Sequence, residues 1–118
     1  METREAILDF QYSEKMKSGL IIGTNLMAQM MSLKEDELAG GKKVLVWYLE
    51  GLLRETRVAE SVLGIGHFGG LEQKVMEVTG RIQLSQFQEA EGSFSEAISL
   101  ATTSCQRSMS FLAAKGLV

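Results

Sequence analysis

No proline interrupts this chain of 118 residues, whereas twelve glycines are spread along it. Proline is the residue that most reliably ends or kinks a helix, because it lacks a backbone N–H and clashes with the preceding turn. A helix in this sequence can therefore continue until glycines or a change of periodicity stop it. We expect long helices that are joined at glycine-rich points.

Apolar residues recur three or four positions apart over four stretches, which is the spacing of helices that bury one face. The first stretch covers about 3–31 and the second has its main body at 42–63. The third covers about 71–91 and the fourth about 93–115, followed by Gly116 as its C-terminal stop. The pattern predicts an all-α, single-domain bundle of four main helices over residues 1–118.

Glycine pairs inside these stretches leave two points open. Gly19 and Gly23 lie on or beside the apolar stripe of the first helix, where they mark either a kink or a close approach by another helix. Gly40-Gly41 interrupts the start of the second helix. The bundle has five helices if that pair breaks the second one.

Two segments have the pattern of a capping box, in which a serine hydroxyl and a glutamate three residues later satisfy the first backbone N–H groups of a helix. They are Ser32–Glu35 and Ser93–Glu96. The second, read over residues 91–98, resembles the turn of a tetratricopeptide repeat, although no second copy lies about 34 residues upstream. The resemblance implies a helical hairpin at this point.

The charge distribution disfavours several classes of partner. The net charge is −3 with both signs interspersed, and only Lys42-Lys43 forms a basic pair. Nucleic acids and anionic membrane surfaces attract a basic face, so we expect neither as a partner. Apolar runs are also too short to cross a bilayer. One cysteine, Cys105, and a charged N-terminus without signal-peptide character predict a cytoplasmic location.

A glycine-rich segment over 64–70 joins the second and third helices, and it contains His67, the only histidine. Its Gly64-x-Gly66-x-x-Gly69 spacing, followed by Gly70, occurs in dinucleotide-binding turns. Those turns follow a strand, and here a charged amphipathic helix precedes the glycines. An interhelical loop is the favoured interpretation. The alternative is a small-molecule or nucleotide-binding enzyme that uses these four glycines and His67.

Other catalytic and metal-binding patterns are poor. A single histidine provides no pair of histidine ligands, and carboxylates do not recur in the paired motifs of metal-dependent bundles. Cys105 lies among apolar residues, where cysteine usually behaves as a small hydrophobic side chain. We therefore predict no catalytic residue, no metal and no cofactor.

The fourth helix is unusually poor in charge, since Arg107 is the only charged residue between Ala97 and Ala114. Such a helix is either central in a bundle or packed on a symmetry-related copy. We predict a role in protein–protein association or assembly, with the chain itself as the first partner, in a homodimer or larger oligomer, and another protein as the second. The predicted interface consists of Ala97, Ala101, Ser104, Cys105, Ser108 and Leu112.

Overall fold

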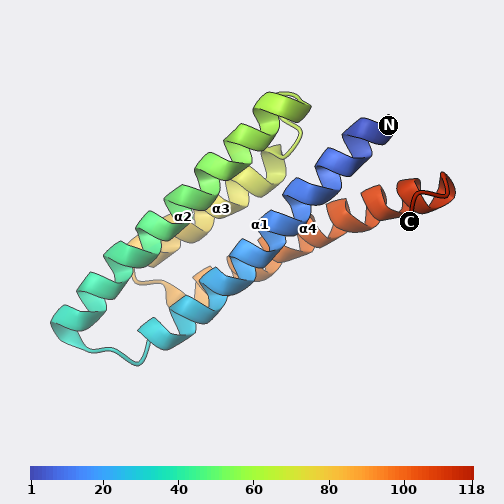
Figure 1. Cartoon of the computed structure of the whole chain (residues 1–118). Helices are drawn as coiled ribbons and strands as arrows, with labels where there is room; N and C mark the ends of the chain where they lie inside the picture. Colours follow the sequence, from blue (N-terminus) through green and yellow to red (C-terminus); the bar gives the residue numbers. More distant parts are fainter.

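Four helices and no strand make up the computed structural model, which describes residues 1–118. Short connections join each helix to the next, and such connections make consecutive helices antiparallel neighbours. α1 packs against α2 and α4, and α3 packs against the same two helices, which closes a ring of four (Figure 1). The predicted all-α bundle is confirmed, with these bounds: α1 Thr3–Met30, α2 Glu35–Leu63, α3 Gly69–Gln83 and α4 Phe87–Ala114.

The core contains one continuous cluster of 18 buried apolar residues. Its largest fully buried side chain is Phe94 of α4. A Cβ atom at Gly23 of α1 would lie 3.0 Å from Phe94 Cε1, and one at Gly19 would lie 2.5 Å from Leu52 Cδ2. The two glycines therefore mark close helix approaches within an uninterrupted α1. Tyr48 of α2 strengthens this contact by donating a 2.7 Å hydrogen bond to the Gly19 carbonyl.

α2 runs unbroken through Gly40 and Gly41, so the five-helix alternative is wrong. A Cβ at Gly41 would lie 2.9 Å from Met30 Cγ, and the glycine therefore lets the end of α1 pack against α2. The first predicted capping box is also wrong. Ser32 Oγ donates to the Gln29 carbonyl at 2.7 Å, and the N-cap of α2 is Lys34, which makes no side-chain cap.

The connection between α3 and α4 lies earlier in the sequence than predicted, at residues 84–86. Ser93 is buried inside α4, so the second capping box and the hairpin implied by the tetratricopeptide resemblance are wrong. α3 instead ends in a Schellman motif, in which Gln86 N–H donates to Arg81 O at 2.8 Å and Ser85 adopts φ 59°. No residue type marks this end in the sequence, because a serine occupies the left-handed position that usually holds glycine.

Gly116 does end the fourth helix, as predicted. It adopts φ 71°, and Leu117 N–H donates to Leu112 O at 2.9 Å in a second Schellman motif. Both chain termini and the 64–70 segment lie at one end of the bundle (Figure 1). The bundle measures 54 × 23 × 17 Å, a slender shape that leaves many apolar side chains on its outside. None of the helices combines the length and the apolar character needed to cross a bilayer.

Candidate functional site

Residues 64–68 form a tightly held loop between α2 and α3. Gly64 and Gly66 adopt φ 121° and 86°, conformations that favour glycine. The backbone N–H of Gly66 donates to a carboxylate oxygen of Glu60 at 2.6 Å, and Phe68 is buried in the core. The loop therefore has one defined shape, which presents His67 toward the interior.

His67 reaches a fully buried carboxylate, that of Asp9 in α1. The imidazole Nε2 lies 2.5 Å from Asp9 Oδ1. Ser104 Oγ donates to both oxygens of the same carboxylate, at 3.1 and 2.9 Å, and Ser108 Oγ donates to Oδ2. We call Asp9, His67, Ser104 and Ser108 the Asp9 cluster. It ties α1, α4 and the loop together at the end of the bundle that holds both termini.

The Asp9 cluster balances a large desolvation penalty. A carboxylate removed from water costs several kcal/mol unless hydrogen bonds and opposite charge replace its hydration. Three side-chain donors from two other parts of the chain supply those bonds to Asp9. Both serine hydroxyls donate to the carboxylate and neither contacts the imidazole, so the order nucleophile–imidazole–carboxylate of a hydrolase triad is not formed.

Beside the Asp9 cluster lies a hollow of about 190 Å³, which we call the His67 pocket. His67 and Gly70 contribute to it from the loop and the start of α3, whereas the other glycines of the predicted loop site, Gly64, Gly66 and Gly69, do not line it. The pocket therefore brings together only two of the five residues of the predicted loop site. The complete lining is His67, Phe68, Gly70, Leu71, Leu100, Thr103, Ser104 and Arg107.

Cys105 faces a different neighbour. Its thiol is buried and donates to a Glu14 carboxylate oxygen at 3.4 Å. Burial, followed by the hydrogen bond and negative charge of Glu14, raises the pKa of the Cys105 thiol from 9.0 to about 11. The thiol is thus held protonated near neutral pH, which opposes a nucleophilic role.

All six residues of the predicted interface face the inside of the bundle. Ala97, Ala101 and Ser108 are fully shielded from solvent, and Ser104, Cys105 and Leu112 are at most 7% exposed. α1 and α3 cover them within a single chain. A second copy that docks on the folded bundle would therefore need another surface.

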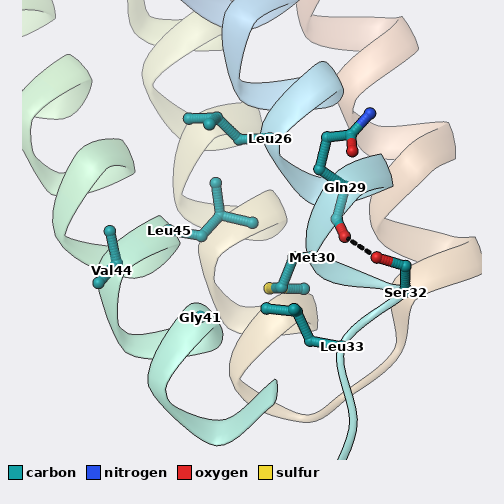
Figure 2. A pocket seen from close by; sticks show the side chains of 8 residues that line it. All are labelled: Leu26, Gln29, Met30, Ser32, Leu33, Gly41, Val44 and Leu45. Atoms are coloured by element: carbon teal, nitrogen blue, oxygen red, sulfur yellow. Dashed lines mark hydrogen bonds between the residues drawn. The ribbon is translucent and has the colours of Figure 1, made fainter. Parts of the chain in front are cut away.

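Exposed apolar side chains gather instead along α1 and α2. The sole tryptophan, Trp47, is 62% exposed, and Ile22, Leu26 and Val44 are 51%, 43% and 60% exposed. Between the two helices lies a hollow of about 430 Å³, which we call the α1–α2 groove (Figure 2). Its lining residues are Leu26, Gln29, Met30, Ser32, Leu33, Gly41, Val44 and Leu45.

The depth of the groove follows from the local sequence. Met30 and Leu45 are buried and form its floor, while Leu26 and Val44 are the exposed rims (Figure 2). Gly41 contributes no side chain to the groove, and Met30 packs close to the place that a Cβ atom would take. Sequence periodicity identified the floor as core, but it did not distinguish rim from core, because both select apolar residues.

Comparisons with protein-family models, with curated proteins and with solved structures find no match to this chain. No group of three or more histidine, cysteine, aspartate and glutamate side chains is placed to hold a metal ion. The features that bear on function are the Asp9 cluster, the His67 pocket and the α1–α2 groove.

Proposed function

We propose that this chain acts in protein–protein association, and that its first partner is a second copy that docks across the α1–α2 groove. The observation that carries the proposal is the 62% exposure of Trp47, which lies three residues after Val44 at the rim of the α1–α2 groove. Aromatic side chains of this size dominate the energetics of interfaces when a partner buries them. A lone exposed tryptophan is therefore the best candidate for an anchor.

Trp47 and the groove are neighbours on α2, although Trp47 itself lines a separate hollow of about 590 Å³ that α2 shares with Gln83 of α3. Val44 lines the groove, and Trp47 follows it by three residues, which places the two side chains on neighbouring turns of one helix face. In a twofold dimer the same patch meets itself, so each Trp47 can enter the groove of the other copy. Such a dimer is a closed assembly, because both copies of the patch are used, and each apolar contact occurs twice.

Charge around the patch favours a second copy over a strongly charged partner. Lys43 and Glu50 flank Trp47 in the sequence with opposite signs. Further along the two helices, Lys15 and Glu55 form an ion pair at 2.8 Å across the α1–α2 contact. Because neither sign dominates, two copies of the surface can approach without net repulsion.

Light scattering across a range of concentrations tests the proposal, with tryptophan fluorescence as a local probe. We expect a dimer whose dissociation on dilution shifts the Trp47 emission to longer wavelength with the same midpoint as the mass. Trp47→Ala should raise the dimer dissociation constant roughly 1,000-fold, since about 2 kcal/mol is lost from each of two symmetric anchors. Circular dichroism should show the variant folded, because the side chain lies outside the core.

The matched control is Ile65→Ala, which removes a fully exposed apolar side chain from the loop that follows α2, away from the groove. It should leave the dissociation constant unchanged. A monomeric mass at every concentration would overturn self-association. A dimer that Trp47→Ala does not weaken would show that the α1–α2 groove is not its interface.

A further inference from the structure

The His67 pocket has a lining in which positive charge is not matched by a carboxylate. Arg107 of α4 lines it, and none of its eight lining residues is acidic. The guanidinium forms no ion pair, and its Nη2 contacts only Ser104 Oγ, at 3.4 Å. Arg107, the only charged residue between Ala97 and Ala114, is thus exposed at the edge of this hollow without an ion-pair partner.

Backbone donors line the same hollow at the start of α3. Gly69 N–H donates to Gly66 O and Glu72 N–H to Phe68 O, but the N–H groups of Gly70 and Leu71 between them have no hydrogen-bond acceptor in the chain. Both residues line the pocket. Since α3 is 15 residues long, its aligned peptide dipoles add positive potential at this end.

The Asp9 cluster fixes the back wall of the pocket. Ser104 is 7% exposed and is held by Asp9, and His67 is held by the same carboxylate. The negative charge of Asp9 is the one opposing feature, and two of its side-chain donors, His67 and Ser104, line the hollow. The wall is therefore rigid, and its hydroxyl and imidazole do not need to be ordered when a ligand binds.

We propose that the His67 pocket binds a small phosphate-type oxyanion. The Arg107 guanidinium supplies charge, the N–H groups of Gly70 and Leu71 supply two donors, and the Thr103 hydroxyl supplies another. A tetrahedral anion has enough oxygens to engage all of these donors at once. Phe68 and Leu100 form apolar walls, so a phosphomonoester with a short apolar substituent fits better than a highly charged nucleotide.

The proposal is independent of the dimer and is tested with inorganic phosphate. In a titration at constant ionic strength, followed by amide NMR, the largest shifts should fall on Gly70 and Leu71. Arg107→Gln should weaken phosphate binding roughly tenfold, the effect of losing one charge-assisted contact. Methyl phosphate should bind more tightly than inorganic phosphate, because its methyl group can contact the apolar walls of the pocket.

Arg54→Gln is the matched control, because it removes the same charge from an exposed position on α2 that forms no ion pair. It should leave phosphate binding unchanged. Equal weakening by both variants, or shifts spread over the basic surface, would mean general electrostatic attraction and would overturn the site. Absence of any shift at Gly70 and Leu71 would overturn it as well.

Discussion

The two ends of this bundle are built from different chemistry on the same four-helix frame. At the end that holds the termini, Asp9, His67, Ser104 and Ser108 form a buried polar network between α1, α4 and the loop. At the other end the interior is apolar, with residues such as Met27, Met30, Leu45 and Ile82. The polar end depends on specific hydrogen bonds, whereas the apolar end depends on buried area and packing.

The difference has a consequence for tolerance to substitution. Apolar cores accept other hydrophobic residues of similar volume, with small losses of stability. A buried network tolerates no missing partner, because the remaining group keeps its desolvation penalty without its hydrogen bonds. The His67 pocket lies against the network, and the α1–α2 groove lies against the apolar end. A rigid wall for a small ligand and an adaptable surface for a protein partner are thus separated along the bundle.

Breaking the polar end at His67 is expected to have a large effect on stability. His67→Ala removes one donor from a fully buried carboxylate and should lower the free energy of unfolding by about 3 kcal/mol. Urea denaturation of the two proteins measures the difference.

Two further variants show whether the loss belongs to the network. In Asp9→Asn, His67→Ala should cost much less than in the wild type, since the buried charge is gone. Phe94→Ala at the apolar core should cost about 4 kcal/mol in both backgrounds. Equal costs of His67→Ala in the wild type and in Asp9→Asn would contradict the network.

The apolar end follows from the sequence far better than the polar end. A three-to-four-residue period places Leu45, Leu49 and Leu52 on one face of a helix, and all three are buried. No comparable rule connects Asp9 with His67 and Ser104, which are separated by 58 and 95 positions. Spacing was the only available signal: Asp9 lies three residues after Ala6 and four before Ser13, on the buried face of α1.

The ends of helices also follow from the sequence only where the residue type signals the backbone conformation. Gly116 has a residue type that reports its left-handed conformation, and the end of α4 was predicted from it. Ser85 has the same conformation without that signal, so the boundary between α3 and α4 was placed too late. The small residues of α4 indicated close packing but not whether the neighbour belongs to the same chain.

The thiol of Cys105 beside the polar end should make stability depend on alkaline pH. Its pKa is about 11 in the folded chain and 9.0 as a free thiol, so the folded state holds the proton over the window between these values. The stabilisation is complete below pH 9 and is lost as pH rises toward 11, by on the order of 2 kcal/mol.

Cys105→Ala is the control for this pH dependence. Urea midpoints measured from pH 8 to pH 11 should fall more steeply for the wild type than for the variant. Because burial also raises the pKa of Tyr48, some decline should persist in both proteins. Parallel curves would mean that Cys105 loses its proton equally well in the folded chain, contrary to its contact with Glu14.

The smallest effect is expected at the α3–α4 connection, which belongs to the apolar end. Ser85 holds φ 59°, a conformation that costs a non-glycine residue about 1 kcal/mol. Ser85→Gly should therefore raise the free energy of unfolding by up to about 1 kcal/mol, reduced by the exposed hydrogen bond that Lys42 donates to Ser85 Oγ. Lys42→Ala separates the strain at Ser85 from its side-chain hydrogen bond. In that background the hydrogen bond is absent, so Ser85→Gly changes only the backbone strain. If Ser85→Gly destabilises the chain even there, the Schellman motif is not what ends α3. A gain would instead show that the boundary is set by backbone hydrogen bonds, with glycine at position 85 providing the signal that the natural sequence lacks.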